Sequence, residues 1–276
     1  MSYKYIIGAG CSFLESHLPW FSYFPSEKYI NMSKGGCGNE FIKQQLVYKV
    51  DELIYKGIKP SEMLVCAQWT GISRQDFLVS REQTITPNDF NDDFKVTQLG
   101  TDVPVFGGWV GDRSDKNIGY IHSGGGNNFA PSWKSKSFED DFFMNYFKYL
   151  ANDYDSVKRY LDCVLFLQSF CKSLKINYVM TNAWNPFQND NGVEEYIYPY
   201  FDHMFRRIDE NHMIWVKSDF LNGVNTKKGK MKKHGGMWQY IVDKDGINWD
   251  NDHPNEEGQK MWGEYILEES TRRKLL

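Results

Sequence analysis

Three residues whose types suit serine-based acyl transfer stand near the two ends of the chain. Ser12 follows a turn with two nearby glycines, and Asp250 precedes His253 by three positions. Serine hydrolysis needs a base that takes the hydroxyl proton and a carboxylate that orients this base. We therefore expect one ring nitrogen of His253 to face Ser12 while the Asp250 carboxylate holds the other.

Each of these residues also has a structural interpretation. Ser12 suits a turn or a helix cap, Asp250 suits a cap or a solvated loop, and His253 suits the start of a helix. Asp252 competes with Asp250 for the orienting role, although a residue directly before a histidine points away from its ring. Cys11 is a second candidate nucleophile beside Ser12.

The hydrophobic pattern predicts the elements that must bring these residues together. Short apolar runs typical of buried strands alternate with amphipathic helical segments, which indicates a parallel sheet with helices on both faces. The expected strands are Tyr3–Ile7, a short one near Tyr29–Met32, Met63–Ala67, Asn177–Thr181 and Met213–Val216. Active sites of such sheets form at the carboxyl ends of the strands, and Ser12 follows the first run.

The helices are predicted from spacing and from their end signals. Asn39 is expected to cap the first helix, and Gly57 and Pro60 to end it. The later helices are expected over Phe138–Leu174, with a break near Asn152 to Asp155, and over Tyr196–Ile208 and Asn255–Glu269.

One segment and one charge run depart from this rhythm within an expected single domain, residues 1–276. Residues 80–135 are rich in Asp, Asn, Gly and Pro, and we expect an insertion with a hairpin over one end of the sheet. A run of five lysines lies within residues 227–233. It is interpreted as a solvated loop, or as a contact for an anionic substrate or partner if it lies near the cleft.

Composition narrows the function classes. The net charge of −4 gives no basic field for nucleic acid, and no apolar stretch approaches the roughly 20 residues of a membrane helix. The start of the chain is predicted to be a strand, with no secretion signal. The five cysteines are widely spaced without a Cys-x-x-Cys pair, so neither a disulfide framework nor a zinc site is expected. A cytoplasmic or virion-associated location is predicted.

Three motifs, in order, carry a resemblance to the SGNH (GDSL-like) serine hydrolases. Gly10-Cys11-Ser12 resembles their first block, which is usually Gly-Asp-Ser. Asn31, followed five residues later by Gly36, resembles their second block. Asp250-x-x-His253-Pro254-Asn255-x-x-Gly258 resembles their last block, so the motifs span most of the chain.

The resemblance implies a three-layer, flavodoxin-like fold and an oxyanion hole. In the family this hole uses the backbone N–H groups of the serine and of the second-block glycine, here Ser12 and Gly36, and an Asn side chain of a third block. Thr70 occupies that Asn position, with Gln68 or Asn39 as alternative donors. The segment from Trp69 through Arg74 is similar to that of bacteriophage-encoded members.

Two functions follow from these expectations. The first is an esterase that hydrolyses short acyl esters, such as acetyl groups on a glycan, through an acyl-enzyme and without a metal or organic cofactor. Its partner is then a small-molecule or glycan ester, with no nucleic acid or membrane. The second is a catalytically silent binding or structural module of a larger assembly. The replacement of the family's Asp by Cys11 and of its Asn by Thr70 favours the second function, and the intact Ser–Asp–His set favours the first.

Overall fold

A five-stranded parallel sheet forms the centre of the protein. The computed structural model describes residues 3–80, 118–123, 149–187, 194–216, 235–244, 249–250 and 253–276. The strands of the sheet are β1 (Tyr3–Ala9), β2 (Ser26–Asn31), β3 (Met63–Trp69), β6 (Asn177–Asn182) and β7 (Met213–Ile214). Their spatial order is β2-β1-β3-β6-β7, and each neighbouring pair is parallel. This is the flavodoxin-like order, so the predicted fold class is confirmed.

The five predicted strands are present, with shifted ends. β1 and β3 each run two residues further than the apolar runs indicated, to Ala9 and Trp69. β7 is shorter than predicted, because Val216 leaves the parallel sheet and forms an antiparallel bridge with Gly235. β3 lies in the middle of the sheet, and all seven of its side chains are buried.

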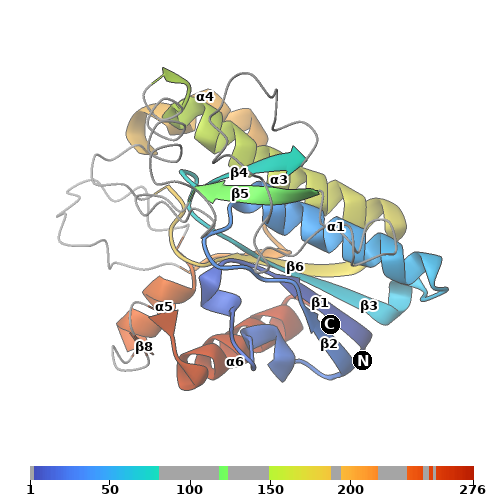
Figure 1. Ribbon diagram of the computed structural model, residues 1–276. Coiled ribbons are helices and arrows are strands. Elements are labelled where there is room, and N and C mark those ends of the chain that lie inside the picture. The colour runs from blue at the N-terminus through green and yellow to red at the C-terminus, as the bar shows by residue number, and fades with distance from the viewer. Residues whose placement is uncertain are drawn as a thin grey trace, which may run out of the picture.

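Helices cover both faces of the sheet, which makes three layers (Figure 1). The helices are α1 (Asn39–Tyr55), α3 (Asp153–Leu174), α4 (Glu194–Phe205), α5 (Met237–Lys244) and α6 (Glu256–Arg272), with single 3-10 turns η1 (Ser12–Leu14), η2 (Trp20–Tyr23) and η3 (Pro60–Glu62). Helices α1 and α3 pack on one face, and α5 and α6 lie on the other. None of the helices that the structure describes has the length and apolar character needed to cross a membrane.

The start of α1 differs from the prediction. Asn39 is the first residue of the helix and not its cap, and Gly38 precedes it. The carboxylate of Asp76 takes the capping role, since it accepts hydrogen bonds from the N–H groups of Gly38 at 2.6 Å and Phe41 at 2.8 Å. The Asn39 side chain is instead hydrogen-bonded to the backbone of Thr70.

Asparagine caps do begin the two other long helices. The Asn152 side chain accepts from Asp155 N at 2.8 Å, so the predicted break near this point is the start of α3. The Asn255 side chain accepts from Gly258 N at 2.9 Å and begins α6 at the expected position. The expected helical residues 138–148 lie outside the described residues.

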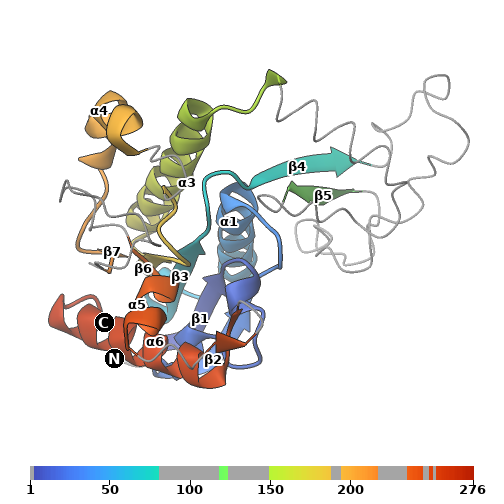
Figure 2. The ribbon, with the colours of Figure 1, turned by 90° about the vertical axis from the view of Figure 1, so that its left-hand side faces the viewer.

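A hairpin borders the predicted insertion. β4 (Gln75–Ser80) and β5 (Ile118–Ser123) pair antiparallel, and Figure 2 shows them projecting away from the body of the sheet beside α1. Only β5 lies within residues 80–135, because β4 ends at Ser80, and the pair extends away from the sheet. The prediction of a hairpin inside this segment and over the end of the sheet is therefore not confirmed. Residues 81–117 and 124–148 lie outside the described residues, as does the lysine run at 227–233.

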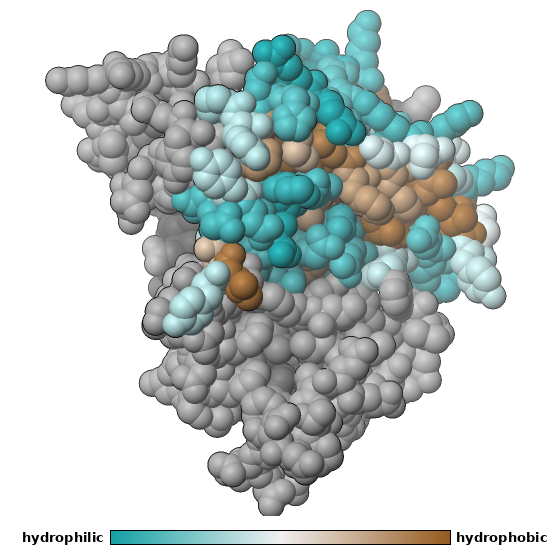
Figure 3. Space-filling view, turned by 90° about the horizontal axis from the view of Figure 1, so that it is seen from above, coloured by the Kyte–Doolittle hydropathy of each residue, from teal (hydrophilic) through white to brown (hydrophobic). Residues whose placement is uncertain are grey.

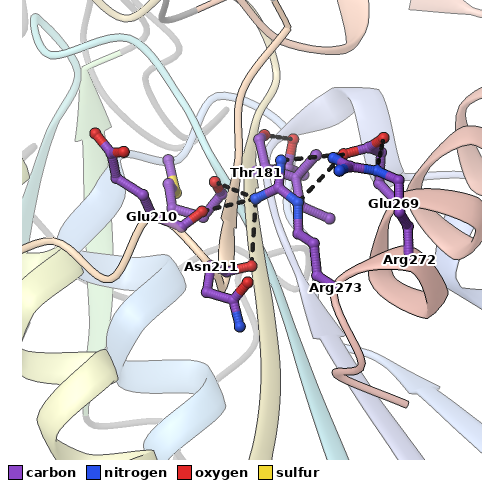
Figure 4. Close-up of polar contacts among 8 residues, drawn as sticks. Thr181, Glu210, Asn211, Glu269, Arg272 and Arg273 are labelled. Carbon is purple, nitrogen blue, oxygen red and sulfur yellow. Dashed lines mark hydrogen bonds and ion pairs between the residues drawn. The ribbon is translucent and has the colours of Figure 1, made fainter.

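The end of α6 is fastened to the edge of the sheet. Nη1 of Arg273 donates to the carbonyl oxygens of Glu210 at 2.7 Å, Asn211 at 3.2 Å and Met213 at 3.3 Å (Figure 4). The guanidinium also forms an ion pair with Glu269 at 3.1 Å. This clamp holds the last helix against the segment that leads into β7, and so fixes the helix that follows His253.

On the opposite face, α1 and α3 meet along a seam that reaches the surface. Phe166 of α3 is 50% exposed, and Nζ of Lys43 on α1 lies 5.2 Å from the centre of its ring. Figure 3 shows hydrophobic residues gathered among hydrophilic ones on the side seen from above. Lys43 thus covers part of an apolar seam with its charged side chain.

The distant cap of α1 gives the first prediction. Asp76→Ala leaves Gly38 N–H and Phe41 N–H without their acceptor, and we expect the free energy of unfolding to fall by about 1–2 kcal/mol in urea denaturation. Asp51→Ala, at an exposed position on the same helix, is the matched control and should change stability by less than about 0.5 kcal/mol. Equal stabilities of the two variants would contradict the capping role.

Candidate active site

Ser12 and His253 are in hydrogen-bond contact at the carboxyl end of the sheet. Nε2 of His253 lies 2.8 Å from Oγ of Ser12. Ser12 opens the 3-10 turn that follows β1, and Thr70 directly follows the neighbouring strand β3. After β1 the next strand of the sheet is β2, on one side of β1, and after β3 the next strand is β6, on the other side of β3. The contact therefore lies at the switch point, where the strand order reverses and where ligands bind in open α/β sheets.

Two side-chain amides hold the turn that carries Ser12. Nδ2 of Asn31 donates to Leu14 O at 2.7 Å. Nε2 of Gln259 donates to Phe13 O, and Oε1 of the same side chain accepts from Trp20 N at 3.0 Å. Gln259 is completely buried in the first part of α6. The two carbonyl groups that follow Ser12 are therefore each fixed by an amide from another element.

His253 is presented by the short segment that enters α6. The residue before a proline is restricted to extended backbone, and His253 with Pro254 forms the two-residue strand β9 (His253–Pro254). The Phe13 ring contacts the imidazole edge to face, with centroids 5.5 Å apart. The ring is thus held between the Ser12 hydroxyl and an aromatic neighbour.

The backbone places Asp250 directly opposite His253. β8 (Trp249–Asp250) pairs antiparallel with β9, and Asp250 is the register partner of His253. Directly opposite residues of an antiparallel pair have Cβ atoms roughly 4.5–5.5 Å apart, within reach of each other's side chains. The structure describes the backbone and not the side chain of Asp250, and Asp252 lies outside the described residues. The orienting role of Asp250 therefore stays a prediction.

The second-block loop lies against the nucleophile turn. Lys34 N donates to Gly10 O at 3.1 Å, and a Cβ atom on Gly35 would stand 3.6 Å from Cβ of Ser12. Gly36 has a φ of 73°, a left-handed conformation that side chains disfavour. This loop therefore brings the backbone of the predicted oxyanion residue Gly36 close to Ser12.

Thr70, the third predicted oxyanion residue, has a free hydroxyl and a fixed backbone. Its Oγ1 is buried and has no hydrogen-bond partner in the described part of the chain. Oδ1 of Asn39 accepts from Thr70 N at 2.8 Å, and Nδ2 donates to Thr70 O at 3.1 Å. The Asn39 amide is thus engaged in holding Thr70. The other alternative donor, Gln68, donates to Sδ of Met237 at 3.3 Å, and sulfur is a weak acceptor that a better one can displace.

The five cysteines belong to the hydrophobic core. All five are free and buried, and the Cys11 side chain is completely inaccessible while Ser12 is partly exposed. Burial, with a smaller contribution from the Asp76 charge, raises the pKa of the Cys37 thiol well above its usual range. Of the two candidate nucleophiles, Ser12 is the one in contact with the histidine.

An open pocket and an aromatic wall border the Ser12–His253 pair. The pocket has a volume of about 510 Å³, and its lining includes Glu15, Asn31, His253 and Glu256. In the wall, the Phe13 and Trp184 rings meet edge to face with centroids 5.2 Å apart. Most of the residues that line the pocket are thus polar, and the wall is aromatic.

Sequence reasoning missed two of these contributors and helix α5. Trp184 lies just after β6, in the same way that Ser12 lies just after β1. Sites form after parallel strands, and this rule could have indicated Trp184. Gln259 has no local signal, because its partners Phe13 and Trp20 are far away in the chain. Within the described ranges, no group of three or more His, Cys, Asp or Glu side chains is placed to hold a metal ion.

Comparison with known proteins adds no relative. No protein-family model and no curated protein sequence matches the chain.

The Gln259 bridge gives the second prediction. Gln259→Leu leaves Phe13 C=O and Trp20 N–H buried and unpaired, and the free energy of unfolding should fall by about 2–4 kcal/mol. The ring resonances of His253 should also shift in NMR spectra, because the turn that carries Ser12 loses a support.

The matched control is a second bridging glutamine far from the site. Gln168 donates to Arg207 O at 3.0 Å and accepts from Asp209 N at 2.7 Å. Gln168→Leu should also lower stability, yet leave the His253 resonances unchanged. Identical His253 spectra for Gln259→Leu and the wild type would refute the supporting role.

Proposed function

We propose that the protein is a serine esterase of the SGNH hydrolase type, which hydrolyses short acyl esters such as acetyl esters of a glycan. The 2.8 Å contact between Nε2 of His253 and Oγ of Ser12 carries this proposal. It pairs a nucleophile with a base at the carboxyl end of a parallel sheet, where a substrate has access. The order of the strands agrees with the fold that the resemblance implies.

The proposed reaction proceeds through an acyl-enzyme. Oγ of Ser12 attacks the ester carbonyl carbon while Nε2 of His253 takes the hydroxyl proton. The oxyanion that forms accepts hydrogen bonds from the N–H groups of Ser12 and Gly36 and from the Thr70 hydroxyl. His253 then gives its proton to the leaving alcohol oxygen. In the second half, Nε2 of His253 takes a proton from water while the water oxygen attacks the acyl carbon. The bond between Oγ of Ser12 and the acyl carbon then breaks, Oγ takes the proton back from His253, and the acid is released.

The supporting residues have separate roles in this proposal. Asp250 accepts from Nδ1–H of His253, keeps the imidazole in the correct tautomer and stabilises the imidazolium. Asn39 and Gln259 hold the backbone of Thr70 and of the serine turn. The polar lining of the pocket, with Glu15 and Asn31, suits a sugar or another polar alcohol better than a long alkyl chain.

A catalytically silent module of a larger assembly is the competing function. The specific observation in its favour is the buried Cys11 at the position of the family's first-block Asp. Labelling by a fluorophosphonate probe, with the adduct mapped by mass spectrometry, separates the two functions. The esterase is expected to carry the adduct on Ser12, and an unlabelled protein would favour the silent module.

Ser12→Ala gives the third prediction. The variant should lose hydrolysis of 4-nitrophenyl acetate and acetylated sugars by several powers of ten. Its free energy of unfolding should stay within about 1 kcal/mol of the wild type, because few packed atoms are removed. Ser173→Ala, on the exposed side of α3, is the control and should keep full activity. Equal rates for Ser12→Ala and the wild type would exclude the esterase.

Thr70→Val gives the fourth prediction. The Thr70 hydroxyl has no partner among the residues that the structure describes, so its removal should leave stability unchanged and lower the rate by roughly 10²–10³. Thr181→Val is the opposite case, because Thr181 Oγ1 donates to Ile214 O at 3.1 Å in the core. That variant should lose about 1–2 kcal/mol of stability and keep its rate. An unchanged rate in Thr70→Val would transfer the donor role to Gln68.

A further inference from the structure

Arg74 is a partly buried cationic residue, and one of its guanidinium nitrogens lacks a polar partner among the described residues. Arg74 lies in the turn between β3 and β4, and its guanidinium carbon stands 4.9 Å from the centre of the Trp184 ring. Its Nη1 is buried and makes no hydrogen bond. A buried donor without an acceptor is destabilising, more so when it is charged. Such an atom suggests a ligand that supplies the acceptor.

The same arginine is connected to the Ser12–His253 pair through two aromatic rings. Trp184, below its guanidinium, contacts Phe13, and Phe13 contacts His253. The Arg74 carbonyl oxygen also lies against the second-block loop, since a Cβ atom on Gly38 would come within 2.7 Å of it. Arg74 is therefore packed between the oxyanion loop and the aromatic wall.

The acidic side chain that follows Arg74 by two positions already accepts hydrogen bonds. Asp76, two residues further along the chain, accepts from Gly38 N and Phe41 N at the start of α1. Among the described residues, no carboxylate forms an ion pair with Arg74. The charge of Arg74 is thus left for a group from outside this part of the chain.

We propose that Arg74 and Trp184 form an anion subsite beside Ser12, so that the preferred ester carries a carboxylate. This inference rests on the proposed esterase function. A planar guanidinium with several N–H donors matches the geometry of a carboxylate, and the Trp184 face holds it in place by a cation–π contact. Glu15 and Glu256 line the pocket beside His253. The pocket thus carries negative side chains and the subsite carries the positive Arg74. The carboxylate of the substrate therefore points toward Arg74 and away from the two glutamates.

Two pairs of esters test the subsite and locate the charge. The first pair is 4-nitrophenyl hemisuccinate and 4-nitrophenyl butyrate, which differ in charge on the acyl part. The second pair is 4-carboxyphenyl acetate and its methyl ester, which differ in charge on the alcohol part. We expect the wild type to prefer the anionic member of one pair by roughly 10- to 100-fold in kcat/KM, as a hydrogen-bonded charge pair contributes.

Variants assign the preference to the arginine. Arg74→Met should reduce the anionic-to-neutral ratio to about one, and Arg74→Lys, which keeps the charge without the planar donors, should retain part of it. Arg206→Met removes an exposed arginine that pairs with Asp202 on α4, and it should keep the wild-type ratio. An anionic preference that survives Arg74→Met would overturn the subsite, and so would the absence of a preference for either anionic ester. Neither result would contradict the proposed esterase function.

A binding measurement separates failure of the subsite from failure of the esterase. If the wild type hydrolyses none of the four esters and no probe labels Ser12, the proposed function fails. Calorimetric titration of Ser12→Ala with monomethyl succinate and with dimethyl succinate then decides the subsite by itself. Binding of the monoanion alone, lost in the Ser12→Ala, Arg74→Met double variant, supports the subsite. Equal affinity for the two compounds, or no binding of either, refutes it.

Discussion

The buried amide of Gln259 connects the two halves of the candidate site. Ser12 and His253 are separated by 241 positions in the chain, so their contact depends on how the last helix is seated. Gln259 binds Phe13 O, next to Ser12, from the same helix that His253 precedes. Because an unpaired buried carbonyl is costly, this bond favours one seating of α6. The Arg273 clamp at the far end of the helix acts in the same direction.

A second set of contacts fastens the segment after β3 to the start of α1. Asn39 reaches the peptide of Thr70 from the helix, and Asp76 reaches the first N–H groups of the helix from the hairpin. Each of the two side chains thus joins the segment after β3 to the start of α1, Asn39 from the helix and Asp76 from the hairpin. The residues between them, which include Arg74, are held at both ends. A loop next to the nucleophile gains a defined geometry in this way.

The strands, the Ser12–His253 pair and the contacts that support this pair differ in how far the sequence predicts them. The strands follow from short apolar runs, since a strand buried on both faces needs continuous apolar residues. The proximity of Ser12 and His253 follows from residue types that act together, and the position of Ser12 after β1 agrees with it. Asn39 was assigned the wrong role, because an asparagine at that position suits a cap as well as a bond to a distant peptide. Gln259 and the Arg74–Trp184 pair depend on contacts between distant segments, which local patterns do not encode.

The buried cysteines make the folded protein a poor target for thiol reagents. Only the thiolate reacts readily with alkylating agents. The pKa of Cys37, Cys66 and Cys163 is raised well above the usual range by burial, and that of Cys171 to about 12. Alkylation therefore requires that the core opens, and each of the five thiols reports the opening of its own surroundings. Brief exposure to iodoacetamide, followed by peptide mass mapping, gives a residue-by-residue record of which layer of the fold opens first.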